Sequence, residues 1–452
     1  DADLLRAQAL ITQAQGARVQ GDLNGAEALA GEALTIYGAL DHQAGAAGAE
    51  TVIANVRFDQ RDLAGAEAGY RAAQQRYAEI GNQGGIASAL NNRAVVLRQR
   101  GDLEQAFALY EEAASIYAAI RNLTGRANTL NNLAALQVIR GALTAAQARF
   151  EEALALWQQI ESRRGVAYSL DNLGTVQRRL GQLADSRAAH ERALALRREI
   201  GHRPGELASL SNLAAVLMEQ GDLAGASVRL ERALALARDL DRPRDEADVQ
   251  HRRGELRRLQ GRVDEAQSHN RDALDRRQQR DDHRAIVTSR LALAQLHLDA
   301  DRRREAEAAL EGVVRDARSG RYDTLAARAH VLLAEASLRR GDAPGATLAL
   351  DAARLLRDGG VEDHDVRLRI DLVTSQIAAR RSADAAAARA ALEQLAERAR
   401  SDGYPLIWLD AHIARVDTLS GVVGREWRTR LANEAAQLGY EGRAQRLRDA
   451  AR

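Results

Sequence analysis

The chain has 452 residues, of which nearly half are hydrophobic, only 3% are aromatic and none is cysteine. Its 64 basic and 63 acidic residues leave a net charge of +1, which gives no general attraction to nucleic acid or to an anionic membrane surface. Without cysteine there is no disulfide framework, no thiolate nucleophile and no cysteine-ligated metal site. No apolar stretch reaches the about 18 residues that a membrane span needs.

A short turn motif recurs every 40 residues along the whole chain. It reads Gly-Asp-Leu at residues 21–23, 101–103 and 221–223, and degraded copies continue as far as Gly421. A fixed period in this range is the signature of a solenoid of stacked repeats. The sequence therefore predicts a long interaction surface rather than a deep catalytic pocket, and we expect a non-enzymatic protein without catalytic residues.

Each repeat has the pattern of two helices. In the copy that follows Gly85, apolar residues keep a helical spacing from Ile86 to Leu97. Gly101 and Asp102 then interrupt the pattern, and the carboxylate of Asp102 is a suitable N-cap for a second helix. About eleven such antiparallel helix pairs fit into the chain.

Small residues recur in columns where the paired helices must approach closely, and a larger residue there would cost about 1–3 kcal/mol. One first-helix column reads Ala14, Ala54, Ala94, Ala134, Gly174, Ala214, Gly254, Ala294 and Ala334. A column near the second-helix ends reads Tyr37, Tyr77, Tyr117 and Trp157. We interpret these aromatic residues as packing between repeats rather than as an exposed stacking platform, because base stacking on RNA requires a basic surround.

The columns of large and small residues, for example Leu170, Leu173-Gly174, Ser186 and Ala193, resemble those of the tetratricopeptide repeat. The chain is similar to the variety of about 40 residues that occurs in spindle-orientation adaptors and in many bacterial regulators, and kinesin light chain carries a relative of it. The resemblance implies an all-α fold, a right-handed superhelical solenoid of antiparallel helix pairs, and a role in protein–protein interaction.

The regularity of the repeat changes along the chain. We expect one solenoid over residues 1–452, with regular repeats at 1–240, degenerate repeats at 241–400, and an irregular C-terminal repeat with a capping helix at 401–452. A looser connector is expected at 358–365. Polar residues at both ends suit capped termini, which favour a finite array over open-ended polymerisation.

A polar ladder on the first helices is the most suggestive candidate site. Its members are Asn91, Asn92, Asn131, Asn132, Asp171, Asn172 and Asn212. In tetratricopeptide arrays this part of the first helix lines the concave groove, and in related adaptors such residues hold peptides. Asparagine is a mediocre helix former whose amide both donates and accepts, so it is suited to clamping the backbone of an extended peptide. The alternative is a structural hydrogen-bond ladder between neighbouring repeats, and the two roles are compatible.

Four arginines accompany the ladder and favour an acidic protein or peptide partner through charge-assisted hydrogen bonds. They are Arg98, Arg178, Arg179 and Arg252. The alternative is a solvated or salt-bridged surface. Neither a glycine-rich phosphate loop nor histidines at a metal-ligand spacing occurs, so we expect no cofactor and no metal site.

Three classes of function fit these features. The first is a scaffold that binds a peptide or helical segment of a protein partner in its groove. The second is a sensor or regulatory arm of a larger bacterial signalling ATPase, kinase or transcription regulator. The third is a self-assembling structural protein. The first residue is Asp1 rather than methionine, which fits either an exported mature chain or a segment of a longer, for example cytoplasmic, protein.

Overall fold

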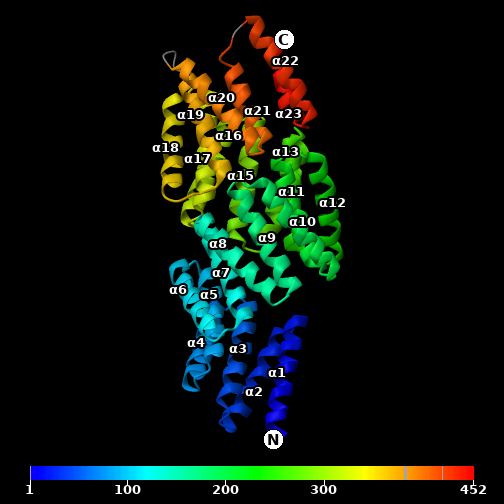
Figure 1. Cartoon of the computed structure of the whole chain (residues 1–452), viewed down its shortest axis with the longest axis vertical. Coiled ribbons are helices and arrows are strands. Elements are labelled where there is room, and N and C mark those ends of the chain that lie inside the picture. Colours follow the sequence, from blue (N-terminus) through cyan, green and yellow to red (C-terminus); the bar gives the residue numbers. More distant parts are fainter. Residues whose placement is uncertain (1, 381–383, 420) are drawn as a thin grey trace. The chain divides into compact units, whose positions relative to one another are not determined.

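The computed structural model describes residues 2–380, 384–419 and 421–452. Within those residues all regular secondary structure is α-helical, and consecutive helices pack against each other (Figure 1). This confirms the predicted all-α repeat fold. The helices are α1 (Ala2–Gln20), α2 (Leu23–Ala39), α3 (Gln43–Asp59), α4 (Leu63–Glu79), α5 (Gln83–Arg100), α6 (Leu103–Ala119), α7 (Leu123–Arg140), α8 (Leu143–Gln159), α9 (Arg163–Arg179), α10 (Leu183–Glu199), α11 (Arg203–Glu219), α12 (Leu223–Asp239), α13 (Pro243–Leu259), α14 (Val263–Gln278), α15 (His283–Asp299), α16 (Arg303–Ser319), α17 (Asp323–Arg340), α18 (Ala343–Asp358), α19 (His364–Ala379), α20 (Ala385–Ser401), α21 (Pro405–Val416), α22 (Gly421–Gln437) and α23 (Glu441–Ala451).

The helices form two compact units. Unit 1 comprises Asp1–Gln137 with Ala148–Ser162, and unit 2 comprises Val138–Gln147 with Arg163–Arg452. In both units an odd-numbered first helix packs against the even-numbered second helix that follows it, and α23 closes the series. The sequence-based division at residues 240 and 400 rests on the regularity of the repeat and stays a prediction.

Aspartate caps begin several of the second helices. The carboxylates of Asp22 and Asp222 each accept a hydrogen bond from the backbone N–H three residues later, over 2.9 and 2.7 Å. Residues 25 and 225 are glycines, where a Cβ would lie 2.2–2.3 Å from the carboxylate oxygen. The prediction for Asp102 was wrong in this respect: it occupies the N-cap position of α6, but its side chain makes no capping bond.

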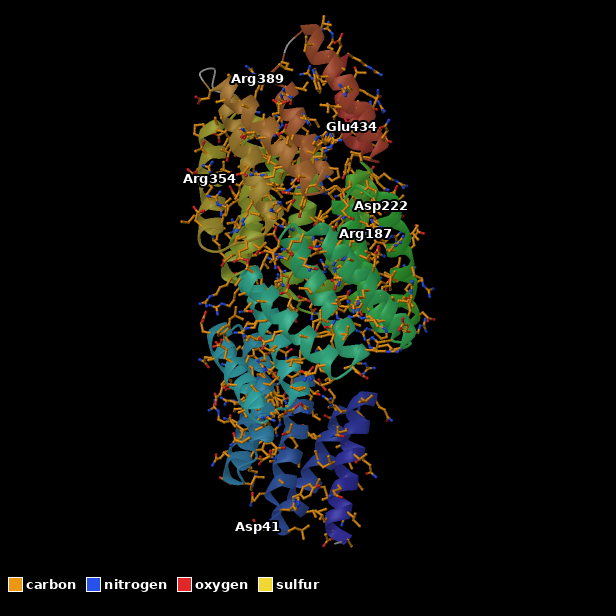
Figure 2. All side chains as sticks on the ribbon, viewed as in Figure 1. Asp41, Arg187, Asp222, Arg354, Arg389 and Glu434 are labelled. Carbon is orange, nitrogen blue, oxygen red and sulfur yellow. The ribbon has the colours of Figure 1, made fainter. Side chains whose placement is uncertain are left out.

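Most of the described turns between consecutive helices contain a single residue in the left-handed conformation. Turns inside a hairpin mostly use glycine, as at Gly21 with φ 86° and Gly101 with φ 88°. Turns between hairpins mostly use other residues, such as Asp41 with φ 49° and Arg121 with φ 56° (Figure 2). Only glycine adopts this region without a steric cost. The 40-residue period therefore includes several positions at which the chain carries local backbone strain.

We expect Arg121→Gly to raise the free energy of unfolding of unit 1 by about 0.5–1 kcal/mol, because it relieves this strain at an exposed turn position. Gly81, with φ 65°, occupies the same turn one repeat earlier. The reciprocal change Gly81→Ala should therefore destabilise unit 1 by a similar amount. Urea denaturation followed by circular dichroism measures both variants, and equal effects of the same sign would contradict this account of the turn.

The aromatic residues Tyr37 and Tyr117 pack between repeats, as we interpreted them from the sequence. Tyr37 is 4% exposed and Trp157 is 6% exposed. The Tyr37 ring lies against Gly45 and the Tyr117 ring against Gly125, each eight residues further along the chain, where a Cβ would fall about 2.4–2.5 Å from the ring. A small residue at the start of each following first helix thus makes room for the ring.

Unit 2 contains contacts between segments far apart in the chain. The predicted loose connector is confirmed, since α18 ends at Asp358 and α19 begins at His364. Within this connector, Glu362 accepts hydrogen bonds from the backbone N–H and hydroxyl of Thr144, over 2.7 and 2.8 Å. The turn after α7 is therefore held by a residue more than 200 positions away.

Later connectors make the same kind of contact with the turns of earlier hairpins. The hydroxyl of Tyr404, which precedes α21, donates to the carbonyl of Arg178 over 3.3 Å. Gly261 approaches Gly442 so closely that a Cβ on Gly261 would lie 2.4 Å from the backbone nitrogen of Gly442. The C-terminal repeats of unit 2 thus pack back onto its first hairpins.

The last helices of the chain include two short ones, α21 with 12 residues and α23 with 11. Helix α20 ends at Ser401 and α21 begins at Pro405, so a short turn separates them. Gly421, in contrast, begins α22 instead of standing in a turn before it. Among the helices that the structure describes, none is long and apolar enough to cross a membrane.

Candidate functional site

The two residues of each step in the polar ladder have different surroundings. The first residue of each step is half-buried at Asn91 and buried in the three repeats that follow. Asn131 is 1% exposed, Asp171 is 4% exposed and Ser211 is 7% exposed. The second members, Asn92, Asn132, Asn172 and Asn212, are all half-buried. Adjacent residues on a helix point in directions about 100° apart, so one column faces the repeat interior while the next stays partly accessible.

In unit 1 the amides of the ladder are linked to each other. The Asn132 amide on α7 donates to the Asn91 carbonyl oxygen on α5 over 3.1 Å, and the Asn91 amide donates to Asn92 over 3.3 Å. A hydrogen-bond chain thus joins neighbouring repeats, as the structural alternative anticipates. Since Asn92 and Asn132 also remain partly accessible, a binding role for them stays a prediction.

In unit 2 the ladder residue Asp171 belongs to a buried polar network. Its carboxylate accepts hydrogen bonds from His190 Nδ1 over 2.8 Å and from the Ser209 hydroxyl over 3.0 Å, and it forms an ion pair with Arg197. Arg197 also donates to the Gly205 carbonyl over 2.5 Å. This network joins α9, α10 and α11, and it positions Asp171 inside the repeat rather than on a binding face.

A similar buried network occurs two repeats later, with other residue types at the positions of Asp171 and His190. His251 replaces the aspartate and Asn270 replaces the histidine, with 3.0 Å between His251 Nδ1 and Asn270 Oδ1. Arg277 takes the place of Arg197 and donates to the Ser289 hydroxyl over 2.6 Å and to the Ala285 carbonyl over 3.2 Å. These polar residues thus connect the hairpin of α13 and α14 to α15, the first helix of the next hairpin. His251 contributes to this packing through Asn270.

The partly accessible column in unit 2 comprises Asn172, Asn212 and Arg252, on α9, α11 and α13. Arg252 Nη2 donates to Asn212 Oδ1 over 3.3 Å, so the guanidinium and the amide lie next to each other on neighbouring first helices. Burial lowers the pKa of Arg252, and the nearby Arg178 lowers it further. This pair combines a cation and an amide on one face, which is the combination expected for an acidic peptide.

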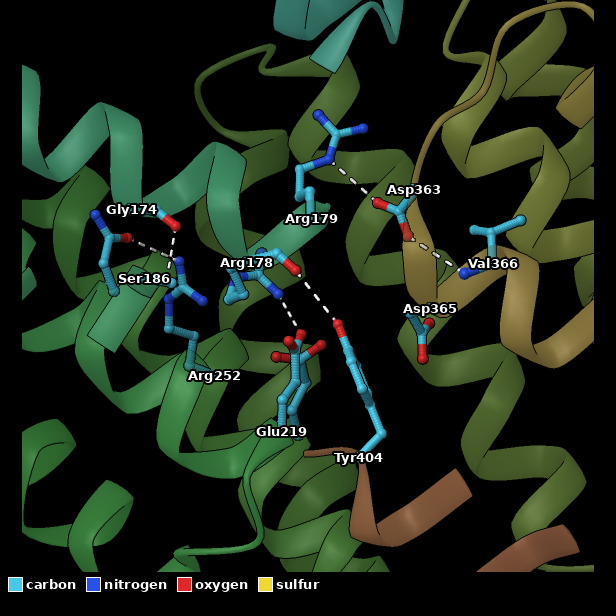
Figure 3. Close-up of polar contacts among 12 residues, drawn as sticks. Gly174, Arg178, Arg179, Ser186, Glu219, Arg252, Asp363, Asp365, Val366 and Tyr404 are labelled. Carbon is cyan, nitrogen blue, oxygen red and sulfur yellow. Dashed lines mark hydrogen bonds and ion pairs between the residues drawn. The ribbon is translucent and has the colours of Figure 1, made fainter. Parts of the chain in front are cut away.

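The other predicted arginines have separate environments. Arg98 is half-buried on α5 in unit 1. Arg178 forms an ion pair with Glu219, and Arg179 Nε donates to Asp363 over 3.1 Å (Figure 3). Arg179 also donates to the Val138 carbonyl over 3.2 Å and to the Thr324 hydroxyl over 3.1 Å. Arg178 and Arg179 therefore follow the salt-bridged alternative, and they connect the first hairpins of unit 2 to its C-terminal repeats.

Asp363 is the acidic centre of this connection. Its carboxylate is 2% exposed, and it also pairs with Arg328 over 3.2 Å. Although burial alone would raise its pKa, Arg328 and Arg179 together lower the pKa of Asp363 to about 2. Close to it, burial raises the pKa of Glu219 to about 7 against the lowering effect of Arg178. The two carboxylates thus have opposite pKa shifts within one cluster.

Five residues of these networks were not predicted from the sequence: His190, Arg197, Glu219, Asp363 and Tyr404. A signal existed for the first two, because His190 breaks the aromatic column of Tyr70, Tyr110 and Phe150, and Arg197 breaks the column that ends at Trp157. Both breaks occur in the repeat that carries Asp171. In the part of the chain that the structure describes, we find no group of three or more histidine, aspartate or glutamate residues that would hold a metal ion.

Comparison with known proteins identifies the family. The family model described as Tetratricopeptide repeat matches residues 45–119, 85–159, 125–199, 165–239 and 245–319. The chain is a tetratricopeptide repeat protein. These overlapping matches cover more than half of its length, in the register of the helix pairs. No curated protein sequence matches the chain.

Solved structures of similar fold include three that this tetratricopeptide repeat protein matches at low identity. The apo form of RapI has 14% identity and a TM-score of 0.53, over 60% of this chain and 96% of that chain. A Rap protein complexed with Competence and Sporulation Factor has 12% identity and a TM-score of 0.56, over 87% and 99% of the two chains. Aspartyl phosphate phosphatase F from Bacillus subtilis has 14% identity and a TM-score of 0.52, over 64% and 75%. At such identities the likeness shows the fold alone.

Proposed function

We propose that this tetratricopeptide repeat protein is a non-enzymatic scaffold that binds a peptide or helical segment of a protein partner along its first helices. The observation that carries the proposal is that the second ladder members stay partly accessible in each unit: Asn92 and Asn132 in unit 1, and Asn172, Asn212 and Arg252 in unit 2. Its neighbouring column is buried after Asn91, so the accessible amides are not required to fill the core.

The chemistry of this column suits an extended peptide. An asparagine amide offers two donors and one acceptor oxygen, and it can pair with both the N–H and the C=O of a peptide backbone. Arg252 adds a cation next to the Asn212 amide, so an acidic residue in the peptide is favoured. The Rap protein complexed with Competence and Sporulation Factor provides a related fold in which a bound factor is present.

The test is a double substitution, Asn132→Ala with Asn172→Ala. The native chain is first used for affinity capture with mass spectrometry, and the captured partner is then titrated against each variant. We expect at least a tenfold loss of affinity with the melting curve nearly unchanged, because each side chain is half-buried and contributes little to the core.

Gln158→Ala, an exposed amide on the second helix α8, is the matched control and should bind like the native chain. Parallel loss of stability and affinity in the double variant would instead assign the ladder a structural role. Light scattering across a range of concentrations identifies the remaining outcome, in which the captured partner is a second copy of the chain.

A further inference from the structure

Unit 2 contains a cavity that none of the residues discussed above for partner binding lines. Its volume is about 590 Å³, within the range typical of small-molecule sites. Side chains of α15, α17, α19, α21, α22 and α23 surround it. The cavity therefore belongs to the C-terminal half of unit 2, where the repeat consensus is weakest.

The lining of the cavity is strongly charged and has an excess of cations. It contains six arginines but only four carboxylates. Three of the arginines form ion pairs: Arg443 lies 3.2 Å from Asp410 and 3.7 Å from Asp299, Arg369 lies 3.0 Å from Asp365, and Arg428 lies 3.5 Å from Asp417. These pairs neutralise half of the cations.

The other three arginines donate to neutral main-chain acceptors. Arg339 Nη1 donates to the Leu298 carbonyl over 2.7 Å, Arg446 Nη1 to the Asp299 carbonyl over 3.4 Å, and Arg380 to the Leu338 carbonyl. Within residues 2–380, 384–419 and 421–452 no carboxylate pairs with any of these three guanidinium groups. Each guanidinium has five N–H donors, so donors and positive charge remain for a ligand.

The fourth lining carboxylate is Glu335, which takes no part in the three sets of ion pairs above. Burial raises the pKa of Glu335, although Arg369 and Arg339 act in the opposite direction. The cavity also has a large apolar surface, to which Leu298, Leu338, Leu372, Ile413 and Leu447 contribute, beside the polar side chains of Gln295, Gln376 and Thr418. A ligand that fits must therefore combine negative charge with a hydrocarbon or ring body.

We propose that this cavity is a binding site for a small organic dianion, with carboxylate or phosphate groups on an apolar body. Three guanidinium groups that donate to main-chain carbonyls and, among the described residues, pair with no carboxylate can accommodate a ligand that carries more than one negative charge. The guanidinium forks of Arg339, Arg380 and Arg446 bind the acidic groups, since arginine pairs with both carboxylate and phosphate oxygens. The leucine and isoleucine side chains contact the body of the ligand.

Isothermal titration of the full chain at low ionic strength tests the proposal with three probes. Suberate carries two carboxylates on an alkyl chain, adenosine diphosphate carries phosphates on a ring system, and inorganic phosphate lacks an apolar body. We expect saturable binding of suberate or adenosine diphosphate with a dissociation constant below about 1 mM, and at least tenfold weaker binding of phosphate. Suberate alone assigns a carboxylate ligand, and the nucleotide alone assigns a phosphate ligand.

Arg446→Gln is the decisive variant, because its side chain is exposed enough that its loss leaves the fold intact. We expect it to weaken binding at least fivefold, and Arg380→Gln with Arg446→Gln to weaken it at least twentyfold. Arg448→Gln, an exposed arginine on the same helix outside the cavity lining, is the matched control and should bind as the native chain does.

The proposal is overturned if neither suberate nor adenosine diphosphate shows saturable binding to the native chain. It is also overturned if Arg446→Gln and Arg448→Gln weaken binding equally. The ligand would then be attracted by the positive charge of the protein surface in general and not by the arginines of the cavity. Melting curves recorded by circular dichroism show whether each variant folds. If the double variant does not fold, the comparison of Arg446→Gln with Arg448→Gln decides the question.

Discussion

Replacing Asp171 by alanine is expected to lower the free energy of unfolding of unit 2 by about 3–5 kcal/mol. The substitution leaves the buried guanidinium of Arg197, which is 7% exposed, without its carboxylate, and it removes the acceptor of His190 and Ser209. Urea denaturation followed by circular dichroism measures the loss. Glu191→Ala is a control, because Glu191 forms an exposed pair with Arg187 (Figure 2) and should cost less than about 0.5 kcal/mol.

The preceding repeat suggests a rescue of this variant. At the positions of Asp171, Gly174, His190 and Arg197, that repeat carries Asn131, Ala134, Phe150 and Trp157. Exchanging all four residues together replaces the ionic network by the uncharged, largely aromatic packing of the preceding repeat, and we expect most of the lost stability to return. If the fourfold variant is as unstable as Asp171→Ala, aromatic packing cannot replace the polar network in this repeat.

Asp363→Ala should destabilise unit 2 by a comparable amount, about 3 kcal/mol or more. It leaves both Arg179 and Arg328 without their shared carboxylate at a site where Asp363 itself is 2% exposed. It also removes the acceptor for the Val366 N–H at the start of α19. Asp358→Ala, five residues earlier and exposed, should have little effect and controls for the connector as a whole.

The pH dependence of stability provides a second measurement on Asp363. Its pKa in the folded chain, about 2, is below the ordinary value of 3.8. The unfolded chain therefore binds the proton more tightly, and stability rises with pH between these values. The contribution, about 2 kcal/mol, is fully present above pH 4 and is lost as the pH falls through 2. Asp363→Ala should flatten the stability curve between pH 2 and 4, whereas Asp358→Ala should not.

The fold was predictable from the sequence because each repeat carries the same local signals. The left-handed turn at Gly101, the small residue at Ala94 and the aromatic residue at Tyr117 each have one packing role that recurs every 40 residues. The period also predicted the helix pairs beyond residue 241, although arginines replace asparagine and leucine there. Repetition therefore compensated for a weak consensus in single copies.

The candidate site was only partly predictable. Asn131 and Asn132 are the same residue type, but a rotation of about 100° along the helix buries the first and leaves the second half-buried, and this depends on the helix packing. Arg178 and Arg179 occupy positions expected to face a partner, whereas Glu219 and Asp363 neutralise them. The partner of Arg179 lies 184 residues away, and no periodic signal predicts such a pairing.

The return of the C-terminal repeats onto the first hairpins of unit 2 limits how this part of the chain can evolve. An open array gains or loses a repeat at little cost, because each copy contacts only its neighbours. In unit 2 the contacts of Thr144 with Glu362, Arg178 with Tyr404 and Gly261 with Gly442 fix the number of helices between each pair. Insertion or deletion of a helix pair between Gly261 and Glu362, the stretch that all three contacts enclose, would shift all of them at once. Unit 2 should therefore vary by substitution at constant length, and should unfold as one cooperative body.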